Sequence, residues 1–192
     1  MSVKQDIGAY MNRQIEHIFS MPDSEYRATL ARLRRGIGHE PGDLPELMGY
    51  YLLSMPESLL DSHGGISKEL NACYGALTLF ALHQQGHPKV ERMNVPDIRF
   101  GTAIARLAEK NEDLPRVQNR FNIMATSDDL PELMHHVRGI IQILSDKKIP
   151  VDYAGLAEAF YDYQFAERRA SVRLKWGMDF YRASGKKEEE KE

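Results

Sequence analysis

The sequence predicts an all-α fold built from two small helical bundles. Apolar residues recur at helical spacing along most of the 192-residue chain, as in residues 3–19, where they stand three or four positions apart. No stretch shows sustained alternation of apolar and polar residues, so we expect no strand. Proline and glycine residues interrupt the helical periodicity at intervals typical of short loops between helices.

The first half of the chain contains four expected helices, at residues 3–19, 25–35, 45–54 and 68–85. Asp23 or Ser24 is placed to cap the second helix, and Pro45 suits the first position of the third. Ser67 is placed to cap the fourth. Apolar side chains cover most of the circumference of this fourth helix, which indicates the central helix of an N-terminal bundle.

The second half contains four more expected helices, at residues 99–110, 115–125, 128–145 and 152–182. Ser127 and the acidic pair Asp128-Asp129 suit the N-terminus of the third of these helices. Asp152 is placed to cap the last one, which is expected to bend near Gln164. Residues 87–98 hold two prolines and little periodicity, which is typical of a linker. We therefore predict an N-terminal bundle over residues 1–95, a C-terminal bundle over residues 96–183 and a charged, disordered tail over residues 184–192.

The composition is that of a globular protein, with 42% apolar and 28% charged residues. No apolar run reaches the roughly 18 residues that a membrane span needs. The N-terminus has no apolar signal core, and the lone cysteine, Cys73, suits a reducing compartment. We therefore expect a cytoplasmic protein without a membrane association.

The sequence contains no pattern that predicts catalysis or a metal site. His83 and His87 are four positions apart, but Gly86 lies between them and no third ligand has motif spacing. Cys73 lies on the apolar side of its helix, where we expect a buried and unreactive thiol. No glycine-rich loop follows a strand, so no nucleotide fingerprint is present. We expect no enzyme activity, no cofactor and no metal.

Basic residues gather at the end of the second expected helix. The net charge of the chain is −3, so nucleic-acid binding would need a local patch of arginine or lysine. Arg27, Arg34 and Arg35 are candidates for such a patch, and Arg27 and Arg34, seven positions apart, share one helix face. The alternative is that these cations only stabilise the C-terminal end of the helix through its dipole.

A second basic row runs along the last expected helix. Arg168, Lys175 and Arg182 recur every seven residues beside an apolar face, a spacing that can follow a phosphate backbone. The alternative is a solvated helix edge stabilised by pairs such as Asp179 with Lys175 or Arg182. Arg120 adds basic character to the second bundle.

Arg138 is a further basic candidate in the second bundle. Both it and Arg120 also fit the alternative of isolated surface residues.

Several segments together resemble a known family. They are Leu33-Arg-Arg-Gly36 before a Pro-Gly loop, 76–86, 100–107, 120–124, 137–141, 151–156 and 172–181. In number, order and spacing they resemble the CasB family, the small subunit of the type I-E CRISPR surveillance complex, Cascade. The resemblance covers roughly residues 24–182.

The resemblance implies an all-α, two-bundle subunit that is not a nuclease. Family members occur as a pair of copies in Cascade and contact its backbone subunits and its large subunit. Their basic surface helps to hold the guide RNA–target DNA region and the displaced single-stranded DNA of the R-loop, while base pairing reads the sequence. An alternative from another class is a helical protein–protein scaffold with little direct nucleic-acid contact, which the net charge favours.

The resemblance also assigns roles to individual arginines. Arg34 and Arg35 match the paired arginines of the family, and Arg120 and Arg138 match basic positions of the second bundle. Asn119 and Gly139 stand where some members carry a second basic residue, so the patch in the second bundle is expected to be thinner here.

Overall fold

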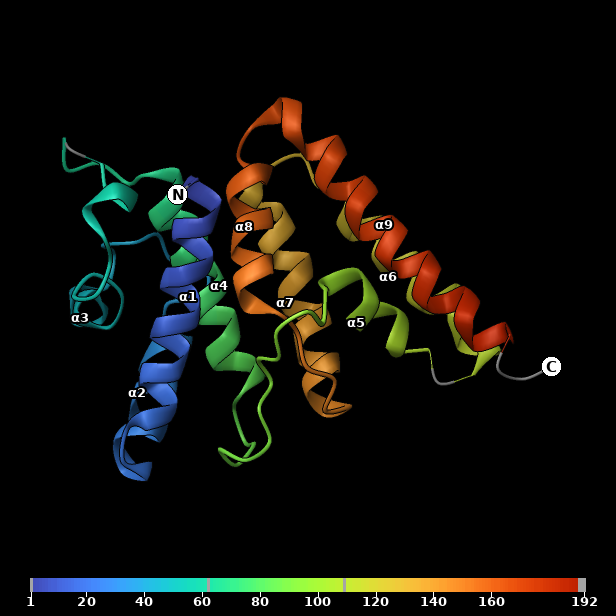
Figure 1. Cartoon of the computed structure of the whole chain (residues 1–192), viewed down its shortest axis with the longest axis horizontal. Coiled ribbons are helices and arrows are strands. Elements are labelled where there is room, and N and C mark those ends of the chain that lie inside the picture. The colour runs from blue at the N-terminus through green and yellow to red at the C-terminus, as the bar shows by residue number, and fades with distance from the viewer. Residues whose placement is uncertain (1, 62, 109, 190–192) are drawn as a thin grey trace.

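The computed structural model describes residues 2–61, 63–108 and 110–189, and these residues form an all-α fold, as predicted (Figure 1). Within these ranges the only strand-like pairing is an isolated bridge between Asn94 and Val151. The α-helices are α1 (Val3–Ser20), α2 (Asp23–Arg35), α3 (Met48–Tyr51), α4 (Lys68–His83), α5 (Phe100–Arg106), α6 (Leu114–Ala125), α7 (Leu130–Asp146), α8 (Tyr153–Tyr163) and α9 (Ala166–Glu189). Short 3-10 helices cover Pro45–Leu47, Glu57–Leu59 and Asn111–Asp113. No helix in the described part is both long and apolar enough to cross a membrane.

Side-chain caps start several of the helices where the sequence predicts them. The Ser67 hydroxyl accepts a hydrogen bond from the Leu70 amide at the start of α4. Asp152 caps α8 in the same way, and Asp129 caps α7. The expected cap of α2 was wrong: Pro22 occupies the N-cap position without a side-chain bond, and Asp23 is already helical.

Helix α4 is the centre of the fold. It packs against α1, α2, α7 and α8, and most of its side chains are buried. A helix that is surrounded on all sides must be apolar around its whole circumference, which is the pattern seen in the sequence. The prediction of a central helix is confirmed.

Two expected helices differ from the structure. The segment predicted as one helix over residues 45–54 consists of a 3-10 turn followed by the four-residue helix α3. The predicted last helix, residues 152–182, is broken at Gln164 and Phe165 into α8 and α9. The Gln164 side chain donates hydrogen bonds to the Lys68 and Phe160 carbonyls and accepts one from Asn71, so the chain turns where it is fastened to α4.

The end of the chain also differs from the prediction. Helix α9 continues to Glu189, so residues 184–189 are helical where a disordered tail was expected. Residues 190–192 lie outside the described residues.

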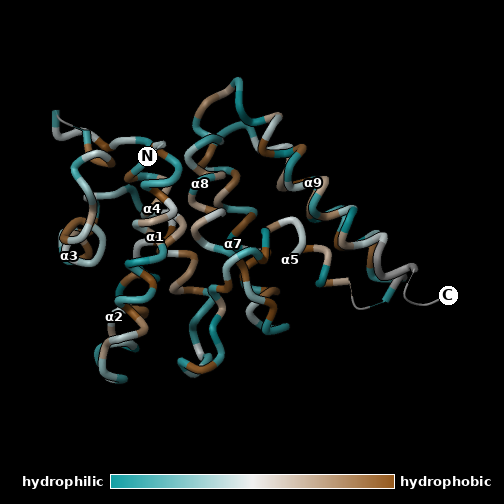
Figure 2. The backbone as a smooth tube through the Cα atoms, viewed as in Figure 1, coloured by the Kyte–Doolittle hydropathy of each residue, from teal (hydrophilic) through white to brown (hydrophobic). Residues whose placement is uncertain are grey.

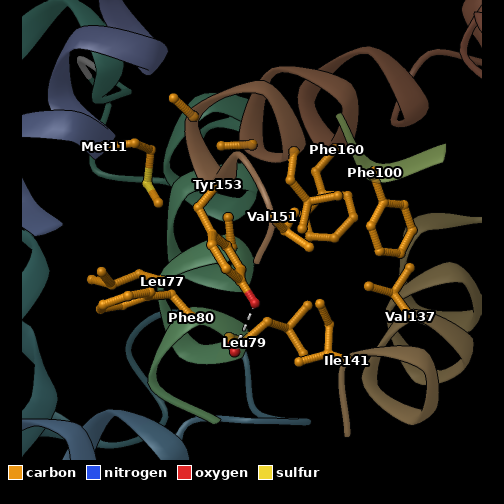
Figure 3. Close-up of a cluster of buried hydrophobic side chains, with 14 of the residues drawn as sticks. Met11, Leu77, Leu79, Phe80, Phe100, Val137, Ile141, Val151, Tyr153 and Phe160 are labelled. Atoms are coloured by element: carbon orange, nitrogen blue, oxygen red, sulfur yellow. Dashed lines mark hydrogen bonds between the residues drawn. The ribbon is translucent and has the colours of Figure 1, made fainter. Parts of the chain in front are cut away.

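The two halves of the chain share one continuous core. Helix α8, from the second half, packs against α1 and α4 of the first half, while α9 packs against α5. Figure 3 shows side chains of both halves in one apolar cluster, among them Met11, Phe80 and Phe160. The expected boundary between two bundles at residues 95 and 96 stays a prediction. The shared core contains residues from both sides of this boundary.

The expected linker is held in place by backbone hydrogen bonds. The Val151 amide donates to the Met93 carbonyl, and the Val95 amide donates to the Val151 carbonyl. The buried Asn94 side chain accepts a hydrogen bond from the Tyr153 amide. These bonds fasten residues 93–95 to the start of α8.

His83 and Tyr153 form a buried polar pair between α4 and α8. The Tyr153 hydroxyl lies 2.9 Å from His83 Nδ1 and donates to the Leu79 carbonyl (Figure 3). His83 is 0% exposed. Burial lowers the pKa of its imidazole from 6.5 to about 3, with a further contribution from His87, so the ring is neutral near pH 7.

This pair predicts a pH dependence of stability. Between about pH 6.5 and pH 3 the unfolded chain protonates His83 while the folded protein does not, so the free energy of unfolding falls as the pH falls. The contribution of one proton is at most about 1.4 kcal/mol per pH unit. We expect His83→Leu to be less stable at pH 7 and to show a shallower loss of stability across this range. Denaturant unfolding at several pH values measures the free energy of unfolding of both proteins. If this free energy depends on pH in the same way in both, His83 is not the group responsible.

Gly101 allows α5 to approach α9 closely. A Cβ atom at this position would lie 2.2 Å from the Trp176 carbonyl oxygen, and that backbone atom cannot rotate away. Gly139, in α7, is a matched control because a Cβ there would meet no atom within 4 Å. We expect Gly101→Ala to lower the free energy of unfolding by about 3 kcal/mol or more. Gly139→Ala should raise it by up to about 1 kcal/mol. Equal effects of the two changes would show that α5 and α9 are not in this close contact.

Candidate nucleic-acid interface

Arg27 and Arg34 lie on one face of α2 and line a cleft of about 670 Å³. The opposite wall of the cleft is formed by residues 84–90, which follow the end of α4. The apolar side chain of Leu30 lies between the two arginines in sequence and also lines the cleft. The predicted sharing of a helix face therefore brings both guanidinium groups to one concave surface.

The positive charges of these two arginines are compensated only in part by the described residues: Arg27 contributes, after Lys89, to the lowered pKa of the Asp23 carboxyl group. In the described residues neither side chain forms an ion pair, and the buried Nε atom of Arg34 has no hydrogen-bond partner. Lys89, the other basic residue of the cleft, lies 3.0 Å from Asp23 and over the ring of Tyr26. The hydrogen bond and charge of this lysine lower the pKa of the Asp23 carboxyl group. The cleft thus retains two guanidinium charges that can attract an anion.

Lys89 is a cleft residue that the sequence analysis did not select. It lies in the segment taken as a linker, directly after Gly86 and Pro88. The turn that follows the end of α4 carries this lysine back towards α2. In the sequence, Gly86 and Pro88 indicate a turn just before Lys89. The contact of this lysine with Asp23 could not be predicted, because it depends on the packing of α2 against α4.

Arg35 points away from the cleft. Its guanidinium lies 3.1 Å from Glu46, and its side chain is 63% exposed. Arg32, on the same helix, donates to the Tyr50 hydroxyl at 2.6 Å. The structure therefore separates Arg35 from Arg34, although the two are adjacent in sequence.

Arg138 lies across α4 from the end of α2. The Tyr74 hydroxyl of α4 donates to the Gly36 carbonyl at the end of α2. The next residue, Gly75, faces Met134 of α7, one turn before the exposed Arg138. Arg34 and Arg138 therefore lie on two helices that pack on different sides of α4.

Arg120 is exposed on α6, which packs against α5 and α7. In Figure 1, α6 lies at the opposite end of the molecule from α2. The structure therefore does not bring Arg120 to the cleft on α2.

The basic row of α9 lies in surroundings rich in carboxylates. Arg168 pairs with Asp162 at 3.2 Å and lies over the ring of Phe165. Lys175 lines a second cleft of about 670 Å³ between α1, α8 and α9, whose lining contains five carboxylates and three basic side chains. Arg182 is exposed on the same helix. This cleft is less favourable to phosphate than the cleft beside α2.

Asp179 has a different partner from those expected. Instead of Lys175 or Arg182 it pairs with Arg99, 3.1 Å away, and its side chain is 8% exposed. Arg99 immediately precedes α5, so the carboxylate is held against the neighbouring helix by the close packing of α5 and α9.

The residues considered for metal binding and catalysis have structural contacts. His83 is buried against Tyr153, and His87 Nε2 lies 3.0 Å from the Ser145 hydroxyl. Cys73 is buried, as predicted, and burial raises the pKa of its thiol to about 12. Across the described ranges, no group of three or more histidine, cysteine, aspartate or glutamate side chains could hold a metal ion.

Comparison with known proteins identifies the family. The family model of CRISPR-associated protein Cse2 matches residues 29–181. The chain belongs to this family. No curated protein matches the sequence significantly.

Solved structures of CasB proteins share the fold of this Cse2 family member. The crystal structure of CasB from Thermobifida fusca is 27% identical in sequence, with a TM-score of 0.72 over 91% of this chain and 97% of that chain. The crystal structure of M. ruber CasB is 21% identical, with a TM-score of 0.66 over 98% of this chain and 97% of that chain. A chain of a CRISPR RNA-guided surveillance complex is 20% identical, with a TM-score of 0.72 over the full length of both chains.

Proposed function

We propose that this Cse2 family member is a non-catalytic small subunit of a type I-E Cascade complex and that it binds the backbone of nucleic acid. The observation that carries the proposal is that two arginines of the cleft beside α2, Arg27 and Arg34, form no ion pair with the described residues. A phosphate group can accept hydrogen bonds from both edges of a guanidinium, which makes arginine well suited to this role.

Arg138, exposed on α7, is proposed as a further contact of the same strand. A single strand that leaves the cleft past the end of α4 towards α7 would meet Arg27 and Arg34 first and Arg138 next. The protein would supply contacts to phosphates only, while base pairing to the guide would supply sequence recognition. In this proposal the strand is guide RNA, target DNA or the displaced DNA strand of the R-loop. Arg35, Arg120, Arg168, Lys175 and Arg182 stay candidates for further contacts outside the cleft.

The proposed partners are the backbone and large subunits of the complex and a second copy of the chain. The match to a chain of an RNA-guided surveillance complex over its full length supports an assembly of this kind. The proposed location is the cytoplasm, where the guide RNA and the invading DNA meet. The proposal includes no nuclease activity. Asp23 and His87 line the cleft, but Asp23 is paired with Lys89 and His87 contacts Ser145 and Glu91. The described residues of the lining include no group of three that could hold a metal ion.

A helical scaffold with little nucleic-acid contact is the second candidate function. The net charge of −3 and the ion pairs of Arg35 and Arg168 favour it. The two candidates differ in what they require of Arg27 and Arg34, because only a nucleic-acid surface would make the binding of single-stranded DNA depend on these two residues.

The double change Arg27→Ala, Arg34→Ala tests the proposal. We expect it to weaken binding of single-stranded DNA to the isolated chain to a similar extent for all sequences. Each phosphate contact contributes about 0.7 to the slope of log affinity against log salt, so the slope should flatten by roughly 1 to 1.5. A fluorescence anisotropy titration at several salt concentrations measures both quantities.

Arg35→Ala is the matched control. It removes one positive charge, where the double change removes two, from the residue next to Arg34 on the same helix, and the side chain that it removes is paired with Glu46. We expect it to change the salt slope less than half as much as the double change. Both variants should keep a thermal midpoint within about 4 °C of the unmodified protein. An unchanged affinity and slope in the double variant would support the scaffold instead.

A further inference from the structure

The outward face of α9 carries a row of exposed apolar side chains. Leu174, Met178 and Tyr181 follow one another at intervals of four and three residues, so they lie above one another on one side of the helix. They are 64%, 43% and 52% exposed, respectively. Figure 1 shows α9 along the outer edge of the molecule, and in Figure 2 hydrophobic residues interrupt its largely hydrophilic course. We call these three residues the outer stripe.

The outer stripe is separate from the core face of the same helix. Val172, Trp176 and Phe180 form that core face and are buried. Tyr181 is held in position, because its ring packs edge-to-face on Phe180 and its hydroxyl accepts a hydrogen bond from Gln118. One end of the stripe is therefore fixed before any partner arrives, which reduces the entropy lost on binding.

Basic side chains border the outer stripe. Lys175 and Arg182 are exposed and lie seven positions apart, along one edge of the stripe. In the described residues neither forms an ion pair, whereas Arg168, at the start of the row, is paired with Asp162. The charge of Lys175 acts in part on Glu158 in the neighbouring cleft, and no such interaction is found for Arg182 among the described residues. A ligand that covers the stripe would therefore bring its edge against two positive side chains.

The combination of an apolar row and a basic border favours a protein partner over a nucleic-acid strand. A phosphate backbone would gain from Lys175 and Arg182 but would leave Leu174 and Met178 in contact with water. An amphipathic helix would cover the apolar row with its own apolar face, in the way that helices recognise one another at spacings of three and four residues. Scattered apolar residues on a surface are ordinary, but a row at helical spacing with a charged border is typical of an interface.

We propose that the outer stripe binds an amphipathic helix of a protein partner that carries acidic residues along one edge. The spacing of the basic row on α9 was expected to follow a phosphate backbone. In this proposal, Lys175 and Arg182 of that row instead orient the helix of the partner. The proposal rests on the proposed function only in taking the partner to be another subunit of the surveillance complex. The nucleic-acid cleft beside α2 is a separate surface.

A designed peptide tests the chemistry on the isolated chain. The probe is a helical peptide of about 18 residues with leucine at helical spacing and glutamate along one edge. The comparison peptide carries lysine in place of glutamate. We expect the acidic peptide to bind at least about tenfold more tightly than the basic one in a calorimetric titration. Equal affinity of the two peptides, or no binding of the acidic one, would overturn the proposal.

Substitutions in the chain locate the binding surface. Leu174→Glu with Met178→Glu should weaken binding of the acidic peptide by at least about tenfold. Lys175→Glu with Arg182→Glu should reverse the preference between the two peptides. Leu53→Glu is the control, because Leu53 is 91% exposed and lies outside the stripe. Circular dichroism and thermal unfolding establish that each variant is folded. A loss of binding in the control as large as in the stripe variant would overturn the assignment.

Assembly with the other subunits of the complex tests the identity of the partner. Co-expression and size-exclusion chromatography should show the chain in the complex, and Leu174→Glu with Met178→Glu should remove it from that fraction. The same variant should bind single-stranded DNA as the unmodified chain does. Loss of DNA binding in this variant would identify the stripe as a nucleic-acid surface and overturn the proposal. If the unmodified chain does not join the complex, the proposed function fails, while the peptide titration still decides the inference about the stripe.

Discussion

The burial of most of α4 is the constraint on which the rest of the structure depends. Four helices must surround α4 to cover its apolar circumference, and they come from both halves of the chain. Because α2 lies on one side of α4 and α7 on another, α4 sets the distance between the arginines of the two halves. The same packing removes His83 and Cys73 from water, so two residues with potential chemistry become parts of the core.

Where this protein presents positive charge depends on which arginines have a carboxylate partner, more than on its net charge. A chain with a net charge of −3 can still present positive surface where arginines lack partners, as Arg27 and Arg34 do within the described structure. Arg35 and Arg168 illustrate the opposite case, since nearby carboxylates compensate their charge. Positive potential is therefore expected beside α2, while at the start of α9 the pairing of Arg168 with Asp162 weakens it.

The turn at Gln164 and Phe165 determines the shape of the second half. Without it, α8 and α9 would continue as one helix, and the apolar face of Trp176 and Phe180 would extend away from the core. The turn lets α8 remain on α1 and α4 while α9 packs against α5. It also leaves the outward face of α9 uncovered over the described length, which is the surface proposed here for a helical partner.

The sequence by itself determined the helical class, the position of most helices, the capping residues of α4 and α8 and the central place of α4. These features depend on side-chain spacing and local hydrogen bonds, which nearby residues encode. The sequence indicated a bend near Gln164, but the tertiary structure decided that the helix breaks there, because the Gln164 side chain is held by Asn71 and Lys68, more than ninety positions earlier. It also decided that Arg34 lines a cleft while Arg35 pairs with Glu46, and that Asp179 pairs with Arg99. Helical spacing places a charged group on a face, but its counter-charge comes from whichever distant element packs beside that face.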